Sequence, residues 1–271
     1  MNQVRVLSLG AGVQSSTLAL MVAVGELEPV DAAIFADTQS EPAAVYRHLD
    51  WLEQQLPFPV YRVTAGSLRD QIIAATRGEQ RMDARPPFFL SDGGMLNRQC
   101  TQDFKLLPIR RKLRELAGLK PRQRAPKTPP VEEWIGISLD EAVRMKPSRV
   151  PYAIHRWPLI EKRMTRGDCL AWLEARGYPQ PPKSACTFCP YHDDALWRDM
   201  KANDPDSWAD AVVVDRAIRN GVKNRHGKRV SPAQWFLHAS RKPLEEVDLR
   251  TAEQAGQFRL FGNECEGMCG V

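Results

Sequence analysis

The fold of this chain is decided by Val4-Arg-Val-Leu-Ser8-Leu-Gly10-Ala-Gly12-Val-Gln14-Ser15-Ser16. The apolar run from Val4 to Leu9 is typical of a buried strand, and the glycines that follow it indicate a tight turn. Ser15 or Ser16 can cap the helix that comes next, which carries apolar residues as far as Val24. A strand, a glycine turn and a helix in this order predict the start of an α/β domain.

The same alternation continues downstream. Residues 31–36 form a second apolar run, residues 41–55 have a helical pattern with Pro42 near the first turn, and residues 60–64 form a third short run. Strands that alternate with helices predict a doubly wound parallel sheet with right-handed crossovers. Such sheets bind ligands outside the carboxyl ends of their strands. We therefore expect Gly10, Gly12, Ser15 and Asp37 to surround one crevice.

The second half of the chain is less regular. We expect an irregular segment over 77–100, a basic helix over 104–116, an exposed connection over 119–130 and a strand over 133–137. Thr165 can cap a helix that runs to about Arg176, with Asp168 in its first turn. A loop with prolines and cysteines then leads into a region that is helical to about Ala239. These patterns predict an α/β domain over 1–160 and a helical, cysteine-bearing region over 161–271.

The composition is that of a soluble protein. The chain has 271 residues, of which 43% are hydrophobic and 26% charged, and this length can bury a full core. No signal peptide pattern opens the sequence, and no stretch reaches the roughly 18 apolar residues of a membrane helix. We therefore expect a cytoplasmic protein without a membrane partner. The formal net charge of +5 is mild and does not by itself indicate nucleic acid.

Two local clusters of cations are more suggestive of a phosphate-rich partner. Both lie among proline, glycine and asparagine residues, so solvated loop charge is an equally good interpretation. The clusters comprise Lys120, Arg122, Arg124 and Lys127, and Lys223, Arg225, Lys228 and Arg229.

The glycine turn after the first strand has the features of a phosphate-binding loop. Gly10 and Gly12 let the backbone approach a phosphate closely, and the helix that follows offers free N–H groups and a partial positive charge. It is not a Walker loop, because no Gly-Lys-Ser/Thr follows, and Ser15 replaces the third glycine of the dinucleotide fingerprint. A purely structural strand-to-helix turn would look similar.

Cysteines supply the second chemical signal. In a cytoplasmic protein, Cys186-Thr-Phe-Cys189 and its loop context favour metal or cluster ligation, while a redox dithiol or two packed thiols are the alternatives. Cys265 lies near the chain end, where a mobile tail can deliver a nucleophilic thiol to a substrate. Cys265 and Cys269 could equally complete a metal site.

Taken together, these motifs resemble those of the PP-loop nucleotide α-hydrolase superfamily, and within it the phosphoadenosine-phosphosulfate (PAPS) and adenosine-phosphosulfate (APS) reductases. The resemblance rests on the order and spacing of several short motifs over most of the chain. They are Ser8 to Ser16 (a modified PP-loop), Ala36-Asp37-Thr38 followed by Glu41 and Tyr46, Cys100-Thr-Gln-Asp-Phe-Lys105-Leu-Leu-Pro108, Gly136-Ile-Ser-Leu-Asp140-Glu141-Ala-Val-Arg144, Pro158-Leu159, Cys186 with Cys189, and Glu264-Cys265.

The resemblance implies roles for particular residues. A nucleotide site would include Ser8, Gly10, Gly12, Gln14, Ser15, Ser16, Asp37 and Gly136. Catalytic roles fall on Cys265, Asp37, Lys105 and Arg144, and metal ligation on Cys100, Cys186, Cys189 and Cys269. The group held would be an iron–sulfur cluster of the 4Fe-4S type, with zinc as the alternative, because thiolate spacing suits both. The nucleotide would be ATP, accompanied by magnesium, or APS or PAPS.

Four departures from the family pattern bear on the activity. Gln99 stands where the cluster-bearing reductases have a second adjacent cysteine, and Ser138 replaces the first arginine of their Gly-x-Arg segment. Cys269 has no counterpart in the reductase tail, so it could be the missing fourth ligand or a resolving thiol. Gln14 replaces the aspartate that helps ATP-cleaving members to hold magnesium and pyrophosphate.

The resemblance implies two enzymatic functions. In the first, ATP adenylates a nucleic-acid acceptor (tRNA or DNA) and sulfur from an iron–sulfur site or a persulfide then displaces AMP, with a cysteine desulfurase as sulfur donor. In the second, the Cys265 thiolate attacks the sulfur of APS or PAPS, and a thioredoxin-like donor or glutathione then releases sulfite. A non-catalytic module that senses nucleotide or cluster is the third interpretation, because fold alone does not determine activity.

Overall fold

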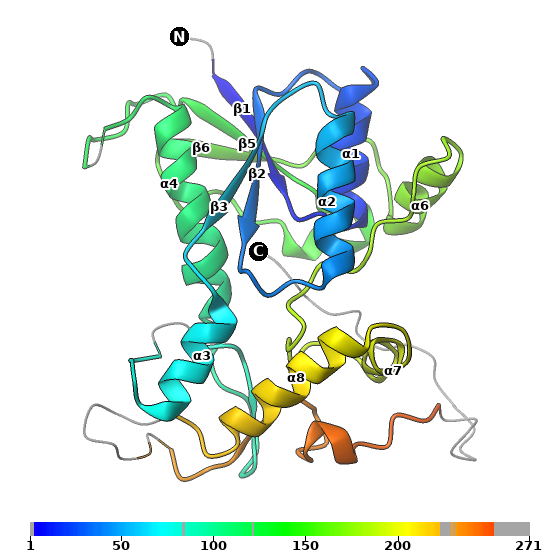
Figure 1. Ribbon diagram of the computed structural model, residues 1–271. Coiled ribbons are helices and arrows are strands. Elements are labelled where there is room, and N and C mark those ends of the chain that lie inside the picture. The colour runs from blue at the N-terminus through cyan, green and yellow to red at the C-terminus, as the bar shows by residue number, and fades with distance from the viewer. Residues whose placement is uncertain (1–2, 83–84, 121, 223–228, 230, 252–271) are drawn as a thin grey trace.

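The computed structural model describes residues 3–82, 85–120, 122–222, 229 and 231–251. Its main feature is a five-stranded sheet, all of whose strand pairs are parallel, in the order β3-β2-β1-β5-β6 (Figure 1). The doubly wound α/β fold predicted from the sequence is thereby confirmed. The strands are β1 (Val4–Leu9), β2 (Ala32–Asp37), β3 (Val60–Thr64), β5 (Val131–Ile135) and β6 (Ala153–Arg156).

Helices cover both faces of this sheet. Because side chains alternate along a strand, Leu7 and Leu9 of β1 pack on one face and Val6 packs on the other. The first face is covered by α1 (Val13–Ala23), α2 (Ala43–Gln55), the short α5 (Pro158–Glu161) and α6 (Arg166–Glu174), and the second by α4 (Leu107–Leu116).

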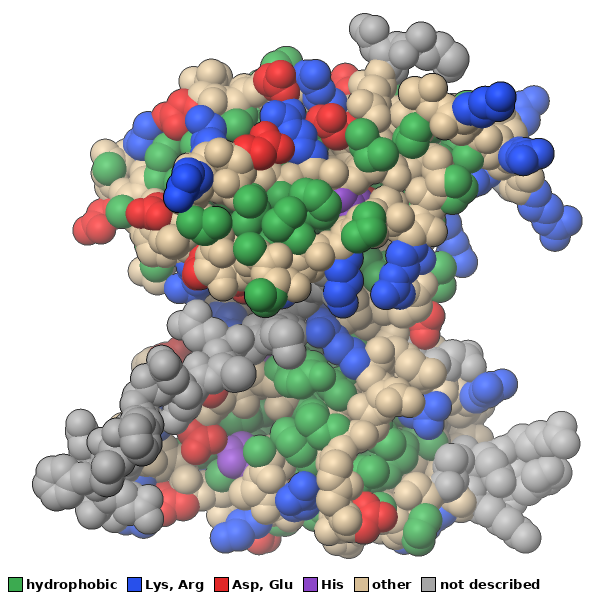
Figure 2. All heavy atoms as spheres, turned by 180° about the vertical axis from the view of Figure 1, so that it is seen from behind, with side chains coloured by type: hydrophobic (Ala, Val, Ile, Leu, Met, Phe, Trp, Pro, Cys, Tyr) green, Lys and Arg blue, Asp and Glu red, His purple; other side chains and the backbone are tan. Residues whose placement is uncertain are grey.

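A second lobe packs below the carboxyl ends of the strands in Figure 1, and Figure 2 shows the two lobes from behind with a constriction between them. Its core includes the buried rings of Phe88, Phe188, Trp197 and Trp235. This core combines residues 68–104 with residues 188–249, and the predicted division of the chain at residue 160 stays a prediction. The elements of this lobe are α3 (Leu68–Arg77), β4 (Phe89–Leu90), α7 (Asp194–Asn203), α8 (Pro205–Ile218), β7 (Trp235–Phe236) and the 3-10 turn Leu244–Glu246.

Several local expectations are met and others are corrected. Thr165 and Asp168 form the capping box of α6. The helix after β1, by contrast, begins at Gly12 as N-cap and not at Ser15 or Ser16, because the glycine turn brings the chain into helical conformation one turn earlier. The strand expected over 133–137 is shifted to Val131–Ile135.

The region expected to be helical to Ala239 is helical only to Ile218. The buried carboxylate of Asp215 accepts hydrogen bonds from the backbone amides of Leu237 and Leu244, and it also pairs with Arg219. Since a buried carboxylate needs such partners, the chain after α8 folds back over the helix and does not extend it.

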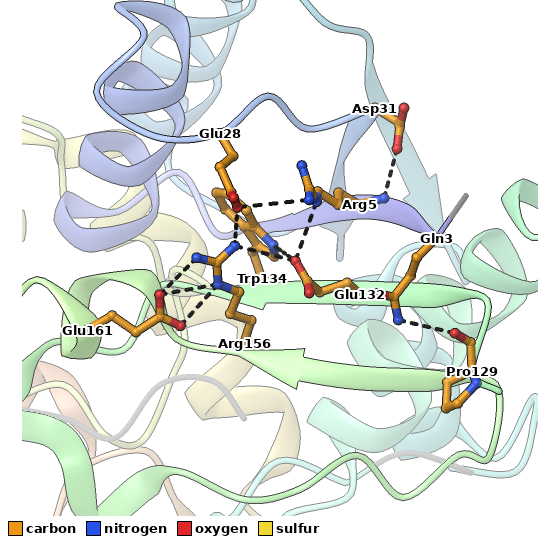
Figure 3. A network of polar contacts seen from close by, with 9 residues as sticks. All are labelled: Gln3, Arg5, Glu28, Asp31, Pro129, Glu132, Trp134, Arg156 and Glu161. Atoms are coloured by element: carbon orange, nitrogen blue, oxygen red, sulfur yellow. Dashed lines mark hydrogen bonds and ion pairs between the residues drawn. The ribbon is translucent and has the colours of Figure 1, made fainter. Parts of the chain in front are cut away.

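An ion-pair network holds β6 to the rest of the sheet on the α1 face (Figure 3). The Arg156 guanidinium lies over the Trp134 ring and pairs with Glu28, Glu132 and Glu161. Each acid comes from a different segment, so one side chain ties the edge strand to three parts of the lobe. Among the described residues, no helix has the length and apolar character needed to cross a membrane.

Candidate nucleotide and cysteine site

In open α/β sheets the ligand crevice lies where the strand order reverses, which in this chain is at the carboxyl ends of β1 and β5. The chain leaves β1 toward β2 and β3 on one side and reaches β5 and β6 on the other, so the order reverses between β1 and β5. The loops that follow these two strands touch: a Cβ atom added to Gly136 would lie 3.0 Å from the Cα and N atoms of Ser15. Gly136 is therefore required by close backbone packing at this reversal of strand order, which we call the switch point.

Hydrogen bonds within the loop after β1 hold its shape. The Ser15 hydroxyl accepts from the Gly10 amide at 3.1 Å and lies 3.3 Å from the Gly12 carbonyl oxygen. Ala11 adopts a left-handed φ of 55°, which turns the chain into α1. The first amides of a helix have no intrahelical acceptor, so this turn presents N–H donors at the mouth of the crevice.

Two of the expected nucleotide residues use their hydroxyls inside the protein. Ser8 donates to Glu133 Oε1 at 2.6 Å on the α4 face, and Glu133 Oε2 lies 3.4 Å from His155 Nε2. Ser16 is fully buried in α1, with its hydroxyl 3.0 Å from His48 Nε2. Both side chains support the loop from behind.

Gln14 links the loop to the segment after β5. Its Nε2 donates to Glu141 Oε2 at 3.2 Å and to the buried Ser138 hydroxyl at 3.4 Å. Glu141 also pairs with Arg144 in the 3-10 turn Leu139–Arg144. The amide of Gln14 therefore joins the glycine loop to an acid–base pair across the crevice.

Asp37 is held at the end of β2. Its Oδ1 accepts from the Gln39 amide at 2.7 Å and from the Tyr46 hydroxyl at 2.8 Å. Burial and the Asp37 carboxylate both raise the pKa of Tyr46, so the phenol stays neutral and remains a donor. One carboxylate edge is thus oriented by the loop and by α2.

Cysteines from two distant stretches meet next to this strand end. Cys100, Cys186 and Cys189 line one pocket, together with Thr38 and Lys105. The Thr38 hydroxyl lies 3.2 Å from the Cys186 sulfur. The Thr187 amide donates to the Ser40 carbonyl oxygen at 2.9 Å, which fastens the cysteine loop to the chain after β2.

The expected catalytic Lys105 pairs with Glu41, which the resemblance placed in a motif without giving it a role. The Glu41 side chain has 0% exposure, accepts from Lys105 Nζ at 3.3 Å and accepts from the Ser184 hydroxyl at 3.2 Å. Its place four residues after Asp37, in the turn before α2, was the available signal, because polar residues after a parallel strand gather at the ligand edge.

Burial keeps two of the pocket thiols, Cys186 and Cys100, protonated. Burial, and then the Glu41 charge, raise the pKa of Cys186 to about 12, against the opposing effect of Lys105. Burial also raises the pKa of Cys100. Buried protonated thiols are poor nucleophiles, whereas a thiophilic metal can displace their protons. The environment therefore suits ligands better than catalytic thiols.

The fit of a metal can be tested on the donor set. Three thiols face one pocket, which is the donor chemistry that zinc and iron–sulfur clusters prefer. Within the described residues, no three His, Cys, Asp or Glu side chains are yet grouped closely enough to share an ion. A metal would have to draw the thiols together, and Cys265 and Cys269, the other expected cysteines, lie outside the described residues.

His192 follows Cys189 by three residues, but it is buried in a different environment. Both of its ring nitrogens are buried without a hydrogen-bond partner among the described residues, and its ring lies 4.6 Å from that of Trp197. Burial lowers its pKa to about 3. His192 is not among the residues that line the cysteine pocket.

Comparison with known proteins yields a likeness of fold. No family model matches this chain, and no curated protein matches its sequence. Among solved structures, the chain is similar to a phosphoadenylyl-sulfate (PAPS) reductase from Candida auris, solved as a phosphate complex, with 16% sequence identity. The match covers 67% of this chain and 75% of that chain, with a TM-score of 0.44. This is a coarse resemblance to the PAPS reductase fold.

The structure thus places the expected residues that it describes in two groups. Gly10, Gly12, Gln14, Ser15, Gly136 and Arg144 lie around the β1–β5 switch point, with Ser8 and Ser16 behind it. Asp37, Lys105, Cys100, Cys186 and Cys189 lie beside the end of β2. Of the second basic cluster, only Arg229 is described, and its guanidinium donates to the carbonyl oxygens of Asn220, Pro232 and Ala233.

Proposed function

We propose that this chain is an adenine-nucleotide-dependent sulfur-transfer enzyme of the PP-loop type. The proposal is based on one observation: the expected nucleotide crevice and the cysteine pocket share a wall, formed by the residues at the end of β2. Thr38, which follows Asp37 at the end of β2, also lines the pocket of Cys100, Cys186 and Cys189. A nucleotide-activated acceptor in the crevice and sulfur held at the cysteines would therefore be neighbours, which is the proximity that transfer between them needs.

The nucleotide would be bound at two points. Its phosphates would accept from the loop amides at the start of α1, where the helix dipole favours negative charge. The oriented carboxylate of Asp37 would accept from donors of the adenosine. Gly136 supports this arrangement, because it lets the β5 loop lie directly against the phosphate loop.

The reaction would exchange an oxygen of the acceptor for sulfur. An acceptor carbonyl oxygen attacks the α-phosphorus of ATP, and pyrophosphate leaves. A cysteine-desulfurase-type donor would supply sulfur as a persulfide, whose terminal sulfur adds to the activated carbon while AMP departs with the oxygen. A thiol reductant would then cleave the remaining S–S bond and leave sulfur on the acceptor. Cys100, Cys186 and Cys189, with Cys269 as the expected fourth ligand, would hold an iron–sulfur cluster or zinc, which supplies a site for sulfur. A nucleic acid is the proposed acceptor.

A sulfonucleotide reductase is the second candidate, and Gln14 is the observation that favours it. Its neutral amide occupies the loop position where ATP-cleaving relatives usually carry a magnesium-binding aspartate, and it is engaged by Ser138 and Glu141. In this reaction the Cys265 thiolate attacks the sulfur of APS or PAPS, forming a thiosulfonate and releasing the nucleotide. A thioredoxin-like dithiol or glutathione then reduces the thiosulfonate and releases sulfite.

The deciding experiment uses anaerobically purified protein, with iron, zinc and sulfide analysis, followed by ATP or by APS and PAPS. Pyrophosphate release that depends on added nucleic acid would support sulfur transfer. Sulfite release from APS or PAPS with a thiol donor would replace it with the reductase. Nucleotide binding without release of pyrophosphate or sulfite would favour the third interpretation, a non-catalytic module that senses nucleotide or cluster.

A matched pair of cysteine variants tests the metal site in the same preparation. Cys186→Ala removes a pocket thiol, whereas Cys169→Ala removes a thiol that is fully buried in the core between α1 and α6. We expect metal content to fall in Cys186→Ala and to persist in Cys169→Ala. Equal metal content in the two variants would contradict ligation at the pocket.

A further inference from the structure

A surface around α4 gathers cations from three segments of the chain. The segments are α4 itself, the connection between α4 and β5, and the segment before β6. Lys and Arg side chains project along this edge of the upper lobe, where the connection extends beyond the sheet (Figures 1 and 2). We call this surface the basic band, and its members are Arg110, Arg111, Lys120, Arg122, Arg124, Lys127, Lys146 and Arg149.

The three segments are packed together around Tyr152. The Tyr152 hydroxyl donates to the Arg110 carbonyl oxygen at 3.2 Å, and the Arg114 guanidinium lies 5.1 Å from the centre of the Tyr152 ring. Ala125 of the connection and Val150 of the segment before β6 pack against the same apolar cluster. The band is therefore a consequence of the fold and not of one stretch of sequence.

Arg114 also fixes the course of the connection. Its Nη2 donates to the carbonyl oxygens of Lys120 and Gln123, at 2.7 and 3.0 Å. The Lys120 amide donates in turn to Gln123 Oε1 at 2.9 Å, and the Gln123 amide donates to the Lys120 carbonyl oxygen at 3.0 Å. One arginine is thus used structurally to present the neighbouring cations at defined places.

Few counter-charges lie near the band, and Glu115, the acid within α4, pairs with Lys112, which is not a band member. No band side chain forms an ion pair with an acidic side chain within the described residues, and residues 116–131 and 142–160 contain no Asp or Glu. Several arginines elsewhere do have acidic partners, as Arg62 has Asp50 and Arg216 has Glu245. Eight like charges on one surface repel one another unless an external anion neutralises them.

The chemistry of the band favours phosphodiesters. Five of its eight members are arginines, whose planar guanidinium groups bind phosphate oxygens in pairs. The band also begins close to the cysteine pocket, because Lys105 of that pocket lies in the π-helix Thr101–Leu106 that continues directly into α4. A long polyanion on the band would therefore reach from the connection toward the site.

We propose that the basic band binds the sugar–phosphate backbone of a nucleic acid and directs it toward the cysteine pocket. The reason for binding a nucleic acid rests on the proposed function, whereas the place of binding is inferred from the charges of the band alone. The sequence indicated only the basic cluster at residues 120–127. The fold adds the cations of α4 and of the segment before β6 to the same surface.

The test measures binding of the full-length protein to a fluorescein-labelled RNA hairpin by fluorescence anisotropy at several salt concentrations. The band variant carries Arg122→Gln, Arg124→Gln and Lys127→Gln. The control variant loses the same charge in the second lobe through Lys201→Gln, Arg216→Gln and Arg250→Gln. Circular dichroism verifies that both variants fold.

We expect the band variant to bind the hairpin about tenfold or more weakly, and its log–log salt slope to fall by about two, since each lost phosphate contact removes 0.7–0.9 of slope. The control should bind like the unaltered protein. An unchanged band variant, or an equal loss in the control, would overturn the inference. So would preferential binding to phosphatidylserine vesicles that the band substitutions abolish.

Calorimetric titration with ATP separates this inference from the proposed function. Hairpin binding that depends on the band, without any ATP binding, would support the band and reject the nucleotide-dependent reaction. ATP binding without hairpin binding would reject nucleic-acid binding by the band and leave the proposed nucleotide site standing.

Discussion

The Thr38 hydroxyl lies 3.2 Å from the Cys186 sulfur and joins the end of β2 to a loop 148 residues later in the sequence. Thr38 is almost fully buried, and its carbonyl oxygen accepts from the Leu68 amide at the start of α3. One residue therefore connects the ligand edge of the sheet, the cysteine pocket and the second lobe. Occupancy of the pocket and of the crevice should consequently be coupled through it.

Thr38→Val tests this connection, because it removes the hydroxyl while keeping the shape of the side chain. A hydroxyl that donates to a ligand sulfur stabilises the thiolate, and loss of such partners typically lowers metal affinity about 10–100-fold. We expect weaker zinc binding in a chelator competition and little change in ATP affinity. Thr17→Val is the control, because it removes a buried hydroxyl bonded to the Val13 carbonyl oxygen within α1. Equal zinc affinities in the two variants would argue against the contact.

Gly136→Ala should open the switch point. The added methyl group would meet the Ser15 backbone at 3.0 Å, and backbone atoms cannot move aside as a flexible side chain can. Overpacking of this kind costs about 1–3 kcal/mol of unfolding free energy and should displace the loop, which weakens ATP binding. Both quantities can be measured by urea unfolding and calorimetry.

Gly167→Ala provides a control of opposite sign for that substitution. Gly167 lies in the first turn of α6, and an added Cβ would be an ordinary 3.6 Å from the Thr165 hydroxyl. Alanine in a helix is favoured over glycine by up to about 1 kcal/mol. A Gly136→Ala protein as stable as Gly167→Ala, with unchanged ATP affinity, would show that the two loops do not need their close approach.

His48 should make stability fall on acidification. Burial lowers the pKa of His48, whose Nε2 lies 3.0 Å from the Ser16 hydroxyl. Because the unfolded chain takes up this proton first, the contribution is fully present above the unfolded pKa of about 6.5 and is lost as pH falls toward the folded pKa. One proton changes the unfolding free energy by at most about 1.4 kcal/mol per pH unit.

The measurement compares urea unfolding of the unaltered protein with that of His48→Gln between pH 5 and 8. The variant should lose less stability on acidification, and the difference between the two curves isolates His48 from other groups. His155 acts in the opposite direction: burial lowers its pKa, but the Glu133 and Lys146 contacts outweigh this and raise it. Parallel curves for the two proteins would contradict the assignment to His48.

The sequence predicted those elements whose residues carry their own signal. Continuous apolar runs mark β1, β2 and β3, and the Thr165 box marks the start of α6. The short edge strand β6 was missed, because four residues with exposed Ile154 and polar neighbours have no apolar run. The helical pattern after Ile218 failed because a tertiary contact, the Asp215 carboxylate with distant amides, overrides local propensity.

For the candidate site, the sequence indicated residues but not their partners, and the roles of these residues stay predictions. Spacing and resemblance indicated the glycine loop, Asp37 and the cysteines. They could not indicate that Ser8 and Ser16 turn inward to Glu133 and His48, because such partners are set by packing of distant segments. Glu41 was named within a motif, but its pairing with Lys105 could not be predicted for the same reason.

Asp37→Asn tests whether the end of β2 binds the nucleotide. The variant keeps an oxygen that can accept from Gln39 and Tyr46, so the loop should retain its shape, but it loses the charge that strengthens a hydrogen bond to the adenosine. Hydrogen bonds to charged groups contribute about 1.5–3 kcal/mol, so ATP and adenosine should both bind at least about tenfold more weakly.

Asp50→Asn is the matched control, because that carboxylate is exposed on α2 and pairs with Arg62. It should leave both affinities unchanged. Loss of ATP affinity with intact adenosine affinity would move Asp37 to the phosphates or to a magnesium ion. If Asp37→Asn and Asp50→Asn bind both ligands like the unaltered protein, the nucleotide does not contact the carboxyl end of β2, and the shared wall formed by Thr38 no longer joins it to the cysteines.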